Sequence, residues 1–275
     1  MRPIYILLLL LFIVAVFIIE FHLYKMRIEP MRNGSPEIIV SLSTSPTRIV
    51  HIEHLIQTLT NQTIPPDKII LNLPYVFKRT NDTFEKIPDF ITQNPLVEIN
   101  MCEDIGPATK VIPTAKLASS PDSIIISVDD DIEYKNNMIE ILLDHSNDNP
   151  NAAITGESYM TLNDNKSELV EGYSSVLYKR KFIDDLDPDV ILNYPKFCYL
   201  ADDFIISNHL RKKNIDVVVV KGDKPFGDIY LEYGNGKDAL RNGANNNSKS
   251  NIDNYQKCSK HLKEMGSLYI THYDK

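Results

Sequence analysis

Three consecutive carboxylates, Asp129, Asp130 and Asp131, close an apolar run that begins at Ile124. A β-branched run this short predicts a buried strand, and ligands of α/β sheets bind beyond the carboxyl ends of the strands. Because side chains alternate along an extended chain, we expect Asp129 and Asp131 on one side and Asp130 on the other. Two converging carboxylates favour a hard divalent cation such as Mg²⁺ or Mn²⁺, whose remaining ligands are water and phosphate oxygens. The alternative is a solvated acidic turn, since Asp is common where strands end.

A second acidic pair, Asp202 and Asp203, opens a predicted helix that extends to about Lys213. Carboxylates at a helix start are favoured by capping and by the helix dipole, and this explains one of the two residues. The other carboxylate is then available for chemistry.

Polar residues follow the first predicted strand, residues 37–43. Its last residue, Ser43, and the loop residues Thr44 and Arg48 combine hydroxyls with one guanidinium, as a nucleotide-binding loop does. The alternative is that the hydroxyls of this loop only cap the following helix.

The segment from Glu103 to Lys110 contains Gly106 and Pro107 directly before a predicted helix. Exposed N–H groups and Lys110 at the positive end of that helix would suit an anion such as a diphosphate. The alternative is an ordinary helix start in which Asp104 is the cap and Lys110 lies in solvent.

The elements that must position these residues alternate between strand and helix through residues 37–145, which predicts a parallel α/β sheet. Besides the strand that begins at Ile124, the apolar runs predict strands at 37–43, 68–73, 97–101, 152–155 and 216–220, and helices at 50–60, 136–145, 202–213 and 255–265. Residues 221–251 are rich in Gly, Asn and Lys, which predicts a mobile loop.

The N-terminus carries sixteen uninterrupted apolar residues from Ile4 to Ile19. A helix of this length spans about 24 Å, and apolar residues just beyond it extend the segment toward the ~30 Å of a bilayer core. A cleaved signal peptide is the alternative, but no pair of small residues follows the run. We expect a single-pass anchor over residues 1–24 with a cytosolic tail, a stem over 25–36, and one catalytic domain over 37–275 on the lumenal or extracytoplasmic side.

Composition narrows the range of partners. The formal net charge is −8, of which residues 1–34 contribute +2 and the remainder −10. An acidic domain without a basic stripe argues against nucleic acid as a partner. The three cysteines have no CxxC spacing, which argues against a zinc site and allows at most one internal disulfide.

The anchor, the α/β half and the strand that ends in Asp-Asp-Asp together resemble the GT-A glycosyltransferases. The triplet resembles their DXD motif, and the segment SLSTSPTRI resembles the first-strand loop that holds the donor's nucleoside. The segment EDIGPATK resembles the donor-facing segment before the DXD strand. The segment LADDF resembles the acidic motif that supplies a catalytic base. The resemblance covers about residues 37–215. It implies a Rossmann-like GT-A fold with a mixed, mostly parallel central sheet flanked by helices. It also implies site residues of three kinds. The metal ligands would be Asp129, Asp131 and His272, with His261 as an alternative to His272. The residues that bind the nucleotide-sugar donor would be Ser43, Thr44, Arg48, Asp104, Lys110, Asp129 and Asp130, and the catalytic base would be Asp203 or Asp202.

The same resemblance implies an activity. A hexosyl or N-acetylhexosaminyl group would pass from a nucleotide-sugar donor, most commonly a UDP-sugar, to a hydroxyl of a glycan, protein or lipid, with Mn²⁺ or Mg²⁺ as cofactor and with inversion. One alternative is a nucleotidyltransferase, although the loop SLSTSPTR lacks the glycine that such enzymes usually need. The other is a non-catalytic binding module presented at a membrane.

Overall fold

The computed structural model describes residues 35–162, 165–227 and 251–271, together with Phe12. The chain divides into two units, residues 1–36 and 37–275, and the whole sheet lies in the second. The predicted anchor and most of the predicted mobile loop lie outside the described residues. Of the helices that the structure describes, none is long and apolar enough to cross a membrane.

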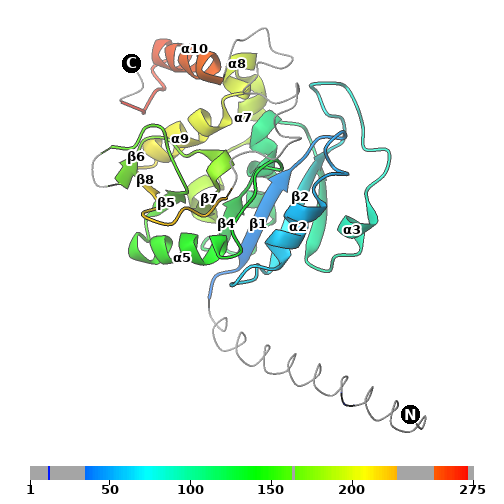
Figure 1. The fold of residues 1–275 in the computed structure, drawn as a ribbon. Helices are drawn as coiled ribbons and strands as arrows, with labels where there is room; N and C mark the ends of the chain where they lie inside the picture. The colour runs from blue at the N-terminus through cyan, green and yellow to red at the C-terminus, as the bar shows by residue number, and fades with distance from the viewer. Residues whose placement is uncertain (1–11, 13–34, 163–164, 228–250, 272–275) are drawn as a thin grey trace, which may run out of the picture. The chain divides into compact units, whose positions relative to one another are not determined.

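Eight strands form one sheet in the order β3-β2-β1-β4-β7-β5-β8-β6 (Figure 1). The strands are β1 (Ile38–Ser43), β2 (Lys68–Pro74), β3 (Val97–Cys102), β4 (Ile124–Ser127), β5 (Ala152–Thr155), β6 (Lys166–Ser167), β7 (Val176–Lys179) and β8 (Asp216–Val219). Neighbours β3, β2, β1 and β4 are parallel, as are β5 and β8, whereas β7 and β6 are antiparallel to the strands beside them. The predicted mixed, mostly parallel α/β sheet is therefore confirmed.

Helices cover both faces of this sheet. They are α2 (Glu53–Thr60), α3 (Asp89–Thr92), α4 (Ile112–Leu117), α5 (Met138–Asp148), α6 (Arg180–Ile183), α7 (Pro188–Asn193), α8 (Lys196–Tyr199), α9 (Asp202–Lys212) and α10 (Asn251–Glu264), with 3₁₀ helices η1 (Gly106–Lys110) and η3 (Gly172–Ser174). Ile39 and Ile125 belong to one apolar cluster with residues of α4, α6, α9 and α10, while their chain neighbours Val40 and Ile126 belong to a second cluster with residues of α2, α3 and α5. The period-two alternation of each strand thus gives the sheet two apolar faces.

The predicted bounds of β1, β2, β3, β5 and β8 are correct to within one residue at each end. Two local predictions differ from the structure. The segment 106–110 forms a 3₁₀ helix ahead of α4 rather than the first turn of an α-helix. Strand β4 ends at Ser127, so the acidic triplet follows the strand instead of continuing it.

A buried polar patch sits among the apolar strands where β1 and β2 approach their carboxyl ends. Ser41 Oγ lies 2.5 Å from the carbonyl oxygen of Lys110, to which it donates, and 2.6 Å from Thr114 Oγ1. The side-chain amide of Asn72 donates to Thr114 Oγ1 at 2.9 Å. All three polar side chains are fully buried. This patch holds η1 and the start of α4 against the sheet, and so fixes the backbone of Lys110.

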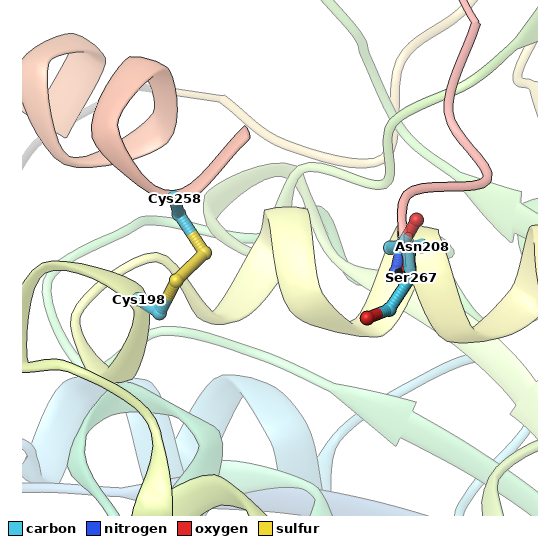
Figure 2. The surroundings of a disulfide bond; sticks show 4 residues. All are labelled: Cys198, Asn208, Cys258 and Ser267. Atoms are coloured by element: carbon cyan, nitrogen blue, oxygen red, sulfur yellow. Dashed lines mark hydrogen bonds between the residues drawn. A yellow bond between two sulfur atoms is a disulfide. The ribbon is translucent and has the colours of Figure 1, made fainter. Parts of the chain in front are cut away.

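The last described helix is tied to the core at two levels. A disulfide joins Cys198 of α8 to Cys258 of α10, and the side-chain amide of Asn208 in α9 donates to the carbonyl oxygen of Ser267 at 3.0 Å (Figure 2). The single internal disulfide that the cysteine count allows therefore forms, and Cys102 is free.

Candidate active site

The loop after β1 holds the acidic triplet. Strands β1 and β4 are parallel neighbours, so the segments that follow them meet at one edge of the sheet. Arg48 Nη1 donates to Asp130 Oδ1 at 2.8 Å and to Asp131 Oδ2 at 3.0 Å, and Thr44 Oγ1 donates to Asp130 Oδ2 at 2.6 Å. The guanidinium is thus shared by Asp130 and Asp131. Strand β4 ends at Ser127, so the alternation of an extended chain does not by itself fix the sides of the triplet. That Asp129 and Asp131 converge on one cation stays a prediction.

Lys110 binds Asp129, the remaining carboxylate of the triplet. Its Nζ donates to Asp129 Oδ1 at 2.8 Å and lies 3.4 Å from Asp202 Oδ2. The Lys110 side chain is only 9% exposed, so the alternative in which it lies in solvent is wrong. Its role toward a diphosphate stays a prediction. Burial alone would lower the pKa of Lys110, but Asp129, Asp202 and Asp203 together raise it well above its usual range. Lys110 is therefore a permanent cation between the triplet and the second acidic pair.

The second acidic pair lies in the first turn of α9, whose N-cap residue is Ala201. Asp202 is 7% exposed, and the structure gives its Oδ2 no hydrogen bond, leaving Lys110 as its counter-charge. Asp203 is partly exposed; its Oδ1 accepts from the backbone N–H of Gly172 at 3.1 Å and its Oδ2 from the hydroxyl of Tyr255 at 3.2 Å. The two aspartates thus have separate surroundings, one paired with a lysine and one held by neutral donors.

Carboxylates outnumber cations around Lys110. Burial raises the pKa of Asp202, and burial with Asp202 alongside raises that of Asp203 well above its usual range. The neighbouring Glu171 is 5% exposed, and its burial raises its pKa to about 7. A carboxylate with a raised pKa accepts a proton more readily than one in water, as a general base must.

The pKa of Asp131 is raised like that of Glu171, again by burial and by neighbouring carboxylates. Burial, with Asp130 and Asp129 close by, raises its pKa to about 7 against the opposing charge of Arg48. Arg48 and Lys110 together do not balance the three carboxylates of the triplet and Asp202, so this end of the sheet favours a further positive charge.

The carboxylate oxygens of the triplet fit a divalent cation that also binds phosphate. Asp129 Oδ2 and Asp131 Oδ1 accept no hydrogen bond within the part of the chain that the structure describes. No group of three or more His, Cys, Asp or Glu side chains in that part is arranged to hold a metal. Mg²⁺ sites commonly use only one or two carboxylates and complete their coordination with water and substrate phosphates. Asp129 and Asp131 thus suit a site that is shared with phosphate. The predicted third ligand, His272, lies outside the described residues.

Asp104 organises the loops beside the site. Its carboxylate accepts from the backbone N–H of Gly106 at 2.8 Å, from that of Lys78 at 2.7 Å, and from the hydroxyl of Tyr199 at 3.1 Å. It is 4% exposed. The structure therefore gives Asp104 a positioning role, close to the predicted cap, and its contact with a nucleotide-sugar donor stays a prediction. Ser43 ends β1 and remains partly exposed at the same edge of the sheet.

Four residues of the site were not among the predicted ones. Glu171 and Gly172 precede β7, and a Cβ atom at Gly172 would lie 2.2 Å from Nζ of Lys110. Tyr255 reaches Asp203 from α10, and the Tyr134 hydroxyl accepts from the backbone N–H of Asp129 at 2.9 Å. Gly172 begins η3, four residues before β7, and the sequence around it carries no signal of this close approach to Lys110.

Comparisons with known proteins find similarity at the level of structure only. No protein-family model matches the chain, and no curated protein matches it. A solved 4-diphosphocytidyl-2C-methyl-D-erythritol synthase is 12% identical with a TM-score of 0.44, over 74% of this chain and 94% of that one. The mannosyltransferase PcManGT from Pyrobaculum calidifontis, in complex with GDP-Man and Mn²⁺, is 12% identical with a TM-score of 0.46, over 75% and 64%. S. aureus TarS is 12% identical with a TM-score of 0.47, over 82% and 43%. The chain thus spans less than two thirds of the last two structures.

Proposed function

We propose that the chain is a metal-dependent glycosyltransferase of the GT-A type, which moves a sugar from a nucleoside-diphosphate sugar to an acceptor hydroxyl. One observation carries the proposal. Lys110 joins Asp129 of the triplet to Asp202 of the second acidic pair, at 2.8 Å and 3.4 Å. A site for a metal-bound diphosphate and a site for a general base therefore share one lysine.

Asp203 is the better candidate for the base. Asp202 is almost fully buried and paired with Lys110, whereas Asp203 is partly exposed and its carboxylate is oriented by two neutral donors. In the proposed step the carboxylate takes the proton of the acceptor hydroxyl while the hydroxyl oxygen bonds to the anomeric carbon. The bond from that carbon to the diphosphate breaks, and its electron pair leaves with the diphosphate. A single displacement of this kind inverts the anomeric centre.

Asp129 and Asp131 would hold the metal through the oxygens that Lys110 and Arg48 leave unused. When bound, Mn²⁺ or Mg²⁺ supplies positive charge against the leaving diphosphate. Arg48 and Thr44 keep the triplet in place, and Lys110 prevents the buried carboxylates from repelling one another. Ser43, at the same edge of the sheet, is available to the donor nucleoside, for which uridine is our first choice.

A donor screen on the full-length protein in detergent tests this proposal. We expect release of a nucleoside diphosphate from one nucleotide sugar with Mn²⁺ or Mg²⁺ and none with EDTA. Asp131→Asn should lower turnover by about 100-fold or more while the melting temperature is retained. Asp144→Asn, an exposed aspartate of α5, is the matched control. Pyrophosphate as the product would identify a nucleotidyltransferase instead. Absence of both products and of any donor-induced thermal shift would favour a binding module.

The anchor over residues 1–24 is part of the proposal. An uncleaved apolar segment would hold the catalytic domain at a membrane, on the lumenal or extracytoplasmic side. Extraction of membranes with alkaline carbonate tests it: the chain should stay in the pellet, and a variant that lacks residues 1–24 should move to the supernatant. Recovery of the full chain in the supernatant would contradict the anchor.

A further inference from the structure

A cavity of about 270 Å³ lies between the loop after β2 and the segment that contains α7 and α8. Its lining consists of Lys78, Arg79, Tyr194, Lys196 and Tyr199 with two leucines. Pockets for drug-sized ligands span ~300–1,000 Å³. The cavity is therefore matched to one sugar ring rather than to a whole nucleotide sugar.

The charge of this lining is opposite to that of the chain. Three of the lining side chains are cationic and none is a carboxylate, although the net charge of the chain is −8. Lys78 is partly committed, since its Nζ lies 2.6 Å from Glu103 Oε1 and donates to the Asp104 carbonyl oxygen. Lys196 is exposed and forms no ion pair with any described carboxylate. The cavity therefore offers positive charge to an incoming anion.

Two tyrosines line the cavity. The hydroxyl of Tyr199 donates to Asp104 at 3.1 Å, and Tyr194 is partly buried. Tyrosine rings combine an apolar face with a polar edge, so they can pack against the C–H face of a sugar while charged groups bind its substituents. Cations and tyrosines together thus suit a sugar that carries an acidic group.

The wall that Tyr199 provides also belongs to the candidate active site. Gly106 begins η1, and a Cβ atom at that position would lie 2.9 Å from the Tyr199 ring. The same 3₁₀ helix ends at Lys110, which pairs with Asp129 and Asp202. A ligand against Tyr199 therefore lies one short helix away from the proposed catalytic carboxylates.

We propose that this cavity is the acceptor subsite and that it selects an acceptor sugar bearing a carboxylate, phosphate or sulfate. Its role as an acceptor subsite rests on the proposed glycosyl transfer. An anionic acceptor would be repelled by the carboxylates around Lys110, and the cations of the cavity offset that repulsion. The cavity also keeps the acidic group of the acceptor away from the base that must take the hydroxyl proton.

Ligand-observed NMR on the full-length protein tests the proposal without donor or turnover. The probes are methyl β-D-glucuronide, glucose 6-phosphate and glucose 6-sulfate, with methyl β-D-glucoside as the neutral match and UDP as a competitor. At least one charged sugar should bind, and Lys196→Glu should weaken its binding about tenfold. Lys260→Glu, at an exposed lysine on α10, should leave it unchanged. Which of the three sugars binds identifies the acidic group.

Several results would overturn the subsite. The wild-type protein could fail to bind any charged sugar, or it could bind the neutral glucoside equally well. Lys196→Glu could leave the binding of the charged sugar unchanged. UDP could displace the charged sugar, which would make the cavity part of the donor site. The two proposals fail separately. If the protein turns over a donor but Lys196→Glu leaves the binding of charged sugars unchanged, only the subsite is disproved. Specific binding of a charged sugar by a protein that releases no nucleoside diphosphate removes the glycosyltransferase and leaves a site for anionic sugars.

Discussion

The hydroxyl of Tyr255 donates a hydrogen bond to Oδ2 of Asp203 across 3.2 Å, although 52 residues separate the two in the chain. The other oxygen, Oδ1, accepts from the backbone N–H of Gly172. Tyr255 lies in α10, one turn before Cys258, whose disulfide ties that helix to α8. The orientation of the proposed base therefore depends on the last described helix.

Tyr255→Phe should lower kcat about tenfold and leave KM for the donor nearly unchanged, because a hydrogen bond to a charged group contributes about 1.5–3 kcal/mol. Since the hydroxyl favours the ionised form of Asp203, its loss raises the pKa of that carboxyl further. The base is active when deprotonated, so the acidic limb of the kcat profile should move to higher pH. Steady-state kinetics across pH measures both effects.

Tyr269→Phe is the control, because the Tyr269 side chain is 41% exposed and its hydroxyl has no described partner. An unchanged pH profile in Tyr255→Phe would mean that Tyr255 only packs against Phe204, whose ring centroid lies 6.0 Å away.

Gly172→Ala tests whether Lys110 must stay between the two acidic groups. The added Cβ would lie 2.2 Å from Lys110 Nζ and 3.0 Å from Asp203 Oδ1, so the lysine must move. We expect a loss of stability of about 1–3 kcal/mol and at least a tenfold fall in turnover. Thermal melting and the donor assay measure these changes.

Gly227→Ala is the matched control, since the nearest atoms to its Cβ, in Glu133, lie at 3.9 and 4.0 Å. Wild-type melting and turnover in Gly172→Ala would show that the lysine can be displaced without consequence.

The sequence predicts the sheet well, because the strands β1, β2 and β5 are short apolar runs rich in β-branched residues and bounded by polar or Pro residues. It cannot fix the sides of the triplet, because periodicity does not show that β4 ends at Ser127. The 3₁₀ helix at Gly106–Lys110 was missed for a similar reason: Gly-Pro announces a helix start and does not specify its type.

The acidic residues of the site are predictable from sequence and their partners are not. Asp129 and Asp202 are recognisable from motifs, but their shared contact with Lys110 requires β4, η1 and α9 to converge. The sequence predicts Arg48 at the nucleoside of the donor. In the structure Arg48 pairs with Asp130 and Asp131, because these buried carboxylates need a counter-charge. Tyr255 follows a long stretch without periodicity, so nothing local connects it with Asp203.

Glu171 should make stability depend on pH. Burial raises its folded-state pKa to about 7, whereas the unfolded chain has the ordinary value near 4.5. Between these values the folded state holds the extra proton, so the free energy of unfolding falls as pH rises through that window. The contribution is fully present below about pH 4.5 and is lost above about pH 7, with a size on the order of 1–3 kcal/mol.

Glu171→Gln keeps the shape of the protonated side chain and cannot ionise. Urea unfolding from pH 5 to 8 should therefore show a weaker decline than in the wild type, with the variant more stable at pH 8. Glu98→Gln, an exposed position on β3, should follow the wild-type curve. Parallel curves for Glu171→Gln and the wild type would assign the slope to other groups.

The disulfide should support both stability and catalysis. It closes a loop of 60 residues, for which the chain-entropy model gives about 4 kcal/mol. Replacing both Cys198 and Cys258 by Ser should lower the melting temperature by roughly 10 °C. It should also reproduce the shifted pH profile of Tyr255→Phe, because α10 carries that hydroxyl. Cys102→Ser is the control and should change neither quantity. A variant that melts earlier but keeps the wild-type pH profile would show that α10 holds Asp203 without the covalent link.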